Sequence, residues 1–163
     1  QFGRLSSTGS QTISRMPSTD RVEVSLESNL QSVDQAEEMA REFAREAGFG
    51  EEDEHRIALA VREAMVNAVI HGNKYDPCKR ALVRLELENH KLVVVVTDQG
   101  LGFDVASVPD PLAEENLLKQ TGRGIFLIRS FMDEVQITRL SPTGTEVRMI
   151  KYPSVMDGKE ESL

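Results

Sequence analysis

Three polar side chains recur at every fourth residue within the segment 57–71. They are Glu63, Asn67 and His71, and the residues between them are mainly alanine, valine and isoleucine. Positions four residues apart share one face of an α-helix, so this spacing predicts a carboxylate, an amide and an imidazole side by side. The Asn67 amide oxygen suits Mg²⁺, which takes oxygen ligands and retains several waters. The Glu63 carboxylate could hold one of those waters or accept a proton from an attacking hydroxyl.

The same three residues also have ordinary structural interpretations. Asn67 can hydrogen-bond a neighbouring loop, and Glu63 can pair with a surface lysine or arginine. His71 stands near the C-terminal end of the expected helix, where a histidine commonly interacts with the helix dipole. The helix face alone therefore favours a structural role, and two glycine-rich turns later in the chain favour a ligand site.

The first glycine-rich turn follows a run of valines and begins at Asp98. An unpaired carboxylate at the end of a buried strand would be costly, so Asp98 needs a donor, and the exocyclic amine of a purine would serve. Gly100 and Gly102 allow the backbone to approach a flat ligand closely. The alternative is a turn in which the Asp98 side chain bonds its own backbone.

The second turn places Gly122 and Gly124 on either side of Arg123, before an apolar segment that is expected to be helical. Free N–H groups and the helix dipole predict an anion site there, and Arg123 could add a charge-assisted hydrogen bond to a terminal phosphate. The alternative is a glycine-rich helix start with a solvated arginine. The turn is not a P-loop, because no Lys-Ser or Lys-Thr follows the glycines.

Composition excludes several other classes of function. The chain has 163 residues, 39% of them hydrophobic and 28% charged, which fits one compact domain. A net charge of −8 without a basic patch argues against nucleic-acid binding. Cys78 is the only cysteine, so neither a disulfide framework nor a cysteine metal cluster is expected. No apolar run is as long as a membrane span, and the first residues lack a signal-like apolar core, which predicts a cytoplasmic protein.

Hydrophobic periodicity predicts the elements that position these side chains. Residues 1–20 and 153–163 are expected to be flexible tails around one folded domain at 21–152. The order of elements predicts an α+β, two-layer sandwich with helices on one face of a mixed, largely antiparallel sheet. Strands are expected at 22–26, 82–87, 92–96, 135–140 and 145–150, helices at 29–47, 51–72 and 124–132, a hairpin turn at 89–90 and a loop at 104–120.

Four motifs occur in a fixed order: Glu63-x3-Asn67, Asp98-x-Gly100-x-Gly102, Gly122-x-Gly124 and Gly144-Thr145. Together they resemble the ATP-binding boxes of the GHKL superfamily, which includes gyrase, Hsp90, histidine kinases and MutL. The segments 61–73, 98–104 and 122–125 are most similar to the anti-sigma-factor serine kinases of the RsbW and SpoIIAB type. The resemblance covers residues 22–151, and it implies the Bergerat-type fold of that superfamily.

The resemblance also implies cofactors and roles for individual residues. ATP and Mg²⁺ would be the cofactors, with Asn67 holding the metal and Asp98 binding the adenine N6 amine. Glu63 would polarise the acceptor hydroxyl, because in-line phosphoryl transfer needs a positioned nucleophile. The segment 104–120 falls where the family has a mobile lid. The further ATP-binding candidates are Gly100 and Gly102 at the adenine pocket, Gly122, Arg123 and Gly124 at the phosphates, Thr145 beside Asp98, and His71.

The function implied by the resemblance is that of a protein-serine kinase that is also an anti-sigma factor. Such a kinase phosphorylates a serine on a small antagonist protein and sequesters a sigma factor, so these two proteins would be its partners, with no direct contact to nucleic acid or membrane. A homodimer would also fit the resemblance, although the residues indicate no interface. The alternatives are a nucleotide-gated module that binds a partner without catalysis and an interaction domain whose glycine turns are only turns.

Overall fold

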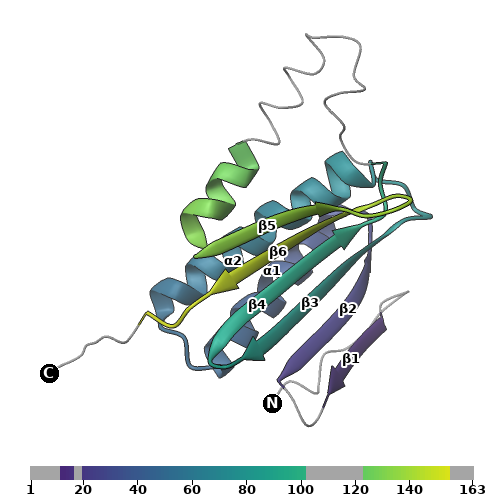
Figure 1. Cartoon of the computed structure of the whole chain (residues 1–163). Coiled ribbons are helices and arrows are strands. Elements are labelled where there is room, and N and C mark those ends of the chain that lie inside the picture. Colours follow the sequence, from purple (N-terminus) through teal and green to yellow (C-terminus); the bar gives the residue numbers. More distant parts are fainter. Residues whose placement is uncertain (1–11, 17–19, 102–122, 155–163) are drawn as a thin grey trace, which may run out of the picture.

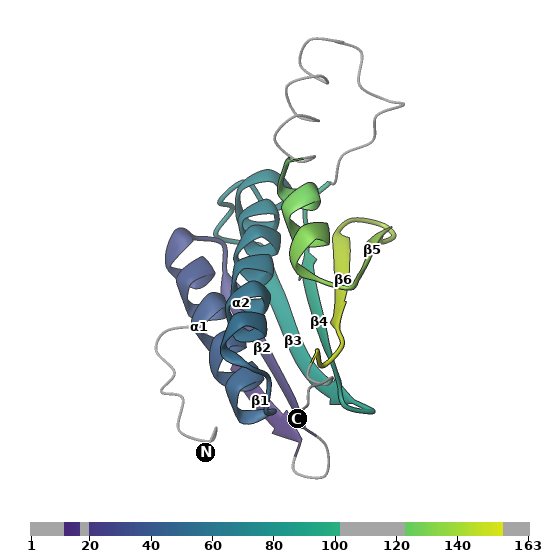
Figure 2. The ribbon, with the colours of Figure 1, turned by 90° about the vertical axis from the view of Figure 1, so that its left-hand side faces the viewer.

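In a computed structural model of the chain, the residues that can be described are 12–16, 20–101 and 123–154. They form a six-stranded sheet in the order β1-β2-β3-β4-β6-β5, and every pair of neighbouring strands is antiparallel (Figure 1). The helices cover one face of this sheet (Figure 2). The strands are β1 Thr12–Met16, β2 Arg21–Glu27, β3 Arg80–Glu88, β4 Lys91–Asp98, β5 Glu134–Arg139 and β6 Thr145–Lys151.

The helical layer consists of α1 Leu30–Glu46, α2 Glu51–Val66 and the helix over residues 123–131. At the C-terminal end of α2 the helix widens into a π-helix, η2 Asn67–Gly72, in which the Asn73 N–H donates to the Ala68 carbonyl at 2.7 Å. No helix in the described ranges is long and apolar enough to cross a membrane.

Local sequence signals explain where the two long helices begin and end. The Asn29 side chain caps α1 by accepting from the Ser32 N–H at 2.9 Å, and Gly48 follows α1 with a positive φ of 95°. Residues 51–54 place four carboxylates in the first turn of α2, where they complement the helix dipole. Asn89 and His90 both have positive φ in the tight turn between β3 and β4.

The core lies between the helices and the sheet, and strand β4 is buried on both of its faces. Val94 and Val96 belong to the cluster that packs beneath the helices, whereas Val93 and Val95 form a second cluster with Ile150. Successive strand residues point to opposite faces of a sheet, so this second cluster lies on the helix-free side. The continuous apolar run in the sequence therefore marks the strand that carries Asp98 at its end.

The fold agrees with the expected two-layer α+β sandwich and differs from the expectation in two respects. The sheet is antiparallel throughout its described strands rather than mixed. Residues 12–16 form β1, which pairs with β2, so the expectation of a tail over 1–20 is wrong for this segment. Its Ser- and Thr-rich composition indicated no strand, and pairing with the edge of β2 supplies the hydrogen bonds that the local sequence does not predict.

Candidate functional site

A pocket of about 240 Å³ opens between the helical layer and the sheet at the C-terminal end of α2. Apolar side chains such as Val96 and Ile125 make up most of its wall, which suits a flat aromatic ring. The pocket contains four of the residues predicted from the sequence: Asn67, His71, Asp98 and Thr145. Its other lining residues are Ala64, Ala68, Gly72, Ile137, Arg139 and Val147.

Asp98 is the buried acidic group of this pocket, and 7% of its surface is exposed. It ends β4 directly opposite Thr145 in β6. One carboxylate oxygen, Oδ1, accepts from the Gly100 N–H at 2.9 Å, so the side chain does bond its own backbone turn. A carboxylate has further acceptor sites, and those that remain can receive a donor from a ligand in the pocket.

Burial raises the pKa of Asp98 above its ordinary value. The backbone N–H groups of Gly100 and Thr145 and the charge of Lys79 oppose this pKa shift, because they stabilise the ionised form. A ligand that donates a hydrogen bond to the carboxylate would stabilise the ionised form further. The site is therefore electrostatically suited to a donor such as an exocyclic amine.

Three glycines surround Asp98 at distances that leave no room for a side chain. A Cβ on Gly72 would lie 2.4 Å from Asp98 Oδ2, and a Cβ on Gly144 would lie 2.5 Å from the Asp98 carbonyl oxygen. A Cβ on Gly100 would lie 1.9 Å from the Gly72 carbonyl oxygen. The end of η2, the turn after β4 and the turn before β6 therefore meet backbone against backbone around the carboxylate. The sequence analysis missed Gly72, although it adjoins His71 in the same motif.

Two of the three residues predicted to share a helix face, Glu63 in α2 and Asn67 at the beginning of η2, lie next to the helix at 123–131, whereas His71 lies further along the π-helix. A Cβ on Gly124 would lie 3.2 Å from Asn67 Nδ2 and 3.5 Å from Glu63 Oε1, so Gly124 faces both side chains with little more than the room of a methyl group between them. Asn67 Nδ2 is buried and has no hydrogen-bond partner among the described atoms. Such an orphaned polar group next to a pocket fits a site that is completed by a ligand.

The residues of this face also fit a magnesium ion. The described residues contain no group of three or more His, Cys, Asp or Glu side chains that could hold a metal. The ion would therefore depend on the Asn67 amide oxygen together with nucleotide phosphates and water, which is a usual arrangement for Mg²⁺.

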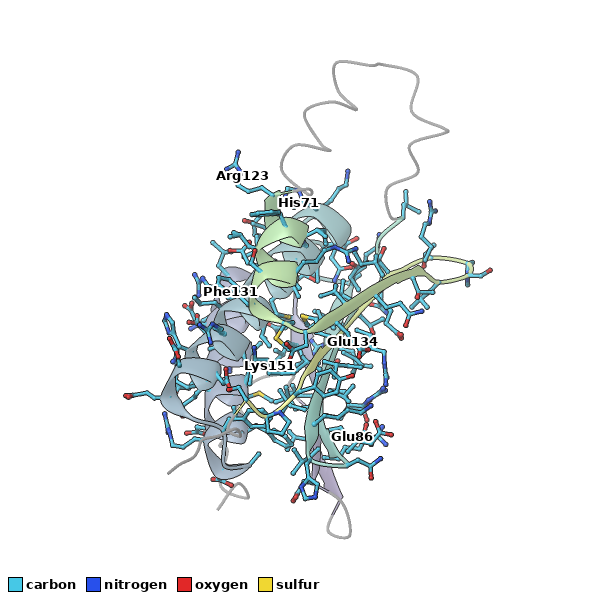
Figure 3. The ribbon with its side chains drawn as sticks, turned by 60° about the vertical axis from the view of Figure 1, so that its left-hand side comes forward. His71, Glu86, Arg123, Phe131, Glu134 and Lys151 are labelled. Carbon is cyan, nitrogen blue, oxygen red and sulfur yellow. The ribbon has the colours of Figure 1, made fainter. Side chains whose placement is uncertain are left out.

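Two of the predicted glycines lie outside the described residues, and one predicted cation is not among the residues that line the pocket. Gly102 and Gly122 lie outside the described residues, as does the expected lid at 104–120. Arg123 is exposed, it lies at the same end of the molecule as His71 (Figure 3), and it does not line the pocket.

The helix at 123–131 is anchored at the end far from the pocket. Lys151 is buried, and its Nζ donates to the Phe131 carbonyl oxygen at 3.0 Å (Figure 3). The same Nζ lies 3.7 Å from Asp53 Oδ1 in the first turn of α2. A lysine near the last carbonyls of a helix satisfies groups that have no intrahelical partner. This contact fixes the helix that carries Gly124 relative to the helix that carries Asn67.

Asn73 is a second residue that the sequence analysis missed, and it is 1% exposed. Its Oδ1 accepts from the Gln99 N–H at 2.8 Å, and its Nδ2 donates to Ser28 Oγ at 2.9 Å and to the Arg80 carbonyl at 3.1 Å. Gln99 and Ser28 are 26 and 45 residues away from Asn73 in the sequence, so no local pattern indicates these two contacts.

Fold and site together define a nucleotide-binding ATPase domain, with a buried aspartate at one end of the pocket and an asparagine-bearing helix along its wall. The chain belongs to the family of histidine kinase-like ATPase domains, which residues 26–151 match. This match confirms the resemblance that the four motifs indicated.

The relatives of the chain include named bacterial regulators. It is 32% identical to the serine-protein kinase RsbW of Staphylococcus epidermidis over 141 residues, which cover 82% of this chain and 87% of the relative. It is 32% identical to the anti-sigma F factor of Bacillus subtilis over 100 residues, which cover 60% of this chain and 68% of the relative. The crystal structure of the RsbU and RsbW domains of a Mycobacterium tuberculosis protein shares the fold, with a TM-score of 0.60 and 18% identity over 82% of this chain and 32% of that one.

Proposed function

We propose that this chain is an ATP- and Mg²⁺-dependent protein-serine kinase that also acts as an anti-sigma factor. Its substrate would be a serine on a small antagonist protein, and its second partner would be a sigma factor. The observation that carries the proposal is that Gly124 faces both Glu63 and Asn67 next to the pocket that contains Asp98. This arrangement brings a candidate base, Glu63, and a candidate metal ligand, Asn67, close to the pocket that contains the Asp98 carboxylate.

Each residue has one role in this proposal. Asp98 accepts a hydrogen bond from the exocyclic amine of adenine, and the apolar pocket wall holds the ring. Asn67 holds Mg²⁺, which neutralises charge on the phosphates when it is bound. The backbone N–H groups around Gly124 meet the phosphates. Gly102, Gly122 and Arg123 complete the adenine and phosphate contacts, and His71 and Thr145 border the nucleotide.

The reaction is a transfer of the γ-phosphoryl group. The serine oxygen forms a bond to the γ-phosphorus while the bond to the β,γ-bridging oxygen breaks, and ADP leaves. The serine proton passes to the Glu63 carboxylate. Positioning of the hydroxyl contributes more than the strength of the base in such a transfer. The half-buried position of Glu63 beside Gly124 supports this role.

The test is phosphoryl transfer from ATP to a cognate serine-containing antagonist. Glu63→Gln and Asn67→Ala should each reduce transfer by roughly 100-fold or more while the protein remains folded. Glu86→Gln is the matched control, since Glu86 lies half-buried on the sheet away from the pocket (Figure 3), and it should transfer at the wild-type rate. Transfer by Glu63→Gln at the wild-type rate would refute the assigned role. Nucleotide binding without any transfer by the wild type would instead indicate a non-catalytic, nucleotide-gated binding module.

A further inference from the structure

We propose that Asn73 is a positioning residue that determines how strongly the site prefers adenine over guanine. It would act by fixing the turn that follows Asp98. This inference rests on the proposed contact between Asp98 and the adenine amine, and it assigns the base preference to a residue that does not line the pocket.

The Asn73 side chain connects the turn to three other parts of the fold. Its Oδ1 receives the Gln99 N–H, between Asp98 and Gly100, and its Nδ2 donates to Ser28 Oγ and to the Arg80 carbonyl. Both donor hydrogens and the acceptor of the amide are therefore in use. A buried amide with all of its groups satisfied has one stable orientation, which makes it a rigid connection.

The two partners of Nδ2 belong to a stable frame at the ends of the strands. Ser28 immediately precedes the cap of α1, and its Oγ donates to the Lys79 carbonyl at 2.6 Å. Arg80 begins β3, and its side chain donates to Ser25 on β2. The Arg80 N–H also donates to the Gln99 side chain. The frame thus holds the turn through the Gln99 backbone and through the Gln99 side chain.

The backbone of Asn73 links the same frame to the metal side of the pocket. Its N–H donates to the Ala68 carbonyl and closes the π-helix η2, which begins at Asn67. Asn73 therefore lies between η2, whose first residue Asn67 would hold the metal, and the turn after Asp98, whose carboxylate would bind the base.

Base preference depends on the direction of the Asp98 carboxylate. Adenine presents an amine donor at the position where guanine presents a carbonyl acceptor, so a fixed carboxylate attracts the first and repels the second. A site built to hydrogen-bond one group rejects the analogue that lacks it, provided that the site groups cannot turn away. If the Gln99 N–H loses its partner, the turn is held by fewer bonds and the carboxylate can reorient. Affinity for ATP then falls more than affinity for GTP.

The experiment compares the dissociation constants of Mg²⁺-ATP and Mg²⁺-GTP by calorimetry for the wild type, Asn73→Ala, Ser28→Ala and Asp98→Asn. Ser28→Ala is the matched control, because it removes a partner of the same Asn73 amide but leaves the bond to Gln99 intact. Asn73→Ala should lower the preference for ATP over GTP by at least about tenfold, which is the effect of roughly 1.4 kcal/mol in differential binding. Ser28→Ala should lower the melting temperature and keep the wild-type preference.

The outcomes separate this inference from the proposed site. A wild type without preference for ATP, or an Asp98→Asn variant that retains the preference, would refute the adenine role of Asp98 and the inference with it. If those two proteins behave as expected and Asn73→Ala keeps the wild-type preference, the role of Asn73 alone fails. An equal loss of preference in Ser28→Ala would also overturn it, because the bond to Gln99 would then not be the cause.

A measurement on the wild type covers the case in which Asn73→Ala does not fold. The Gln99 amide should exchange its hydrogen slowly in the nucleotide-free protein, because it is bonded to buried Asn73 Oδ1. Exchange at the rate of an open loop would show that the turn is not held and would overturn the inference.

Discussion

A methyl group at Gly100 should damage this domain more than the same addition at any other described glycine. The new Cβ would lie 1.9 Å from the Gly72 carbonyl oxygen and 2.3 Å from the Gly72 carbonyl carbon. Carbon and oxygen atoms pack at about 3.5 Å, so the two backbone segments must separate by roughly 1.5 Å. No side chain can turn away to relieve this contact, because the opposing atoms belong to the backbone.

Overpacking of this kind costs about 1–3 kcal/mol, and the backbone contact places Gly100→Ala near the upper limit. At about 2–4 °C per kcal/mol for a chain of this size, the melting temperature should fall by roughly 6–12 °C. Affinity for ATP should fall as well, because separating Gly72 from Gly100 displaces the surroundings of Asp98. Differential scanning calorimetry with and without Mg²⁺-ATP measures both effects.

Gly50→Ala provides the control for this prediction. A Cβ on Gly50 meets nothing within 4 Å, and the φ of −68° suits alanine. The free energy of unfolding should therefore change by less than about 1 kcal/mol. If Gly100→Ala melts within about 2 °C of the wild type and binds ATP with wild-type affinity, the close approach of the two segments does not exist in solution.

Three further perturbations test other parts of the molecule. Gly124→Ala should leave the melting temperature almost unchanged but slow phosphoryl transfer by roughly tenfold or more, because its Cβ would displace Asn67 slightly. Rapid-quench kinetics measures the transfer rate, and an unchanged rate would contradict the close approach of Gly124 to Asn67. Lys151→Met should lower the free energy of unfolding in urea by about 1–3 kcal/mol, since it removes a hydrogen bond and the cation beside buried Asp53, while the ATP affinity stays within about threefold. Burial raises the pKa of Asp98, so the folded protein binds that proton more tightly than the unfolded chain does. The stability of the nucleotide-free wild type relative to Asp98→Asn should therefore fall as the pH rises from the ordinary aspartate pKa through the raised one, and urea titrations at stepped pH that show the opposite slope would refute this assignment.

The long helices and the hairpin were predictable because their signals are local. Asn29 caps α1, Gly48 follows it with a positive φ, and Asn89 with His90 forms the tight turn that sets the register of β3 and β4. Strand β1 was not predictable, because its formation depends on pairing with β2 rather than on its own composition.

Residues of the candidate site could be predicted where the chemistry of the side chain itself calls for a partner. Asn67 and Asp98 were found because an amide on an apolar helix and a carboxylate after a buried strand both need partners. Gly72 and Asn73 act through contacts with segments more than 20 residues away, at Gly100 and Gln99. Such contacts follow from the packing of the whole domain and leave no periodic pattern in the sequence.

The π-helix at residues 67–72 limits how the length of this chain can change. An i→i+5 turn contains one residue more than an α-helical turn, and such a turn can arise from a one-residue insertion into an α-helix. Deleting one residue here would restore the α-helix and rotate everything that follows by roughly 100°. Gly72 would then leave Asp98 while Asn67 stayed in place. Homologous sequences that bind nucleotide in this way should therefore keep the number of residues in this segment constant.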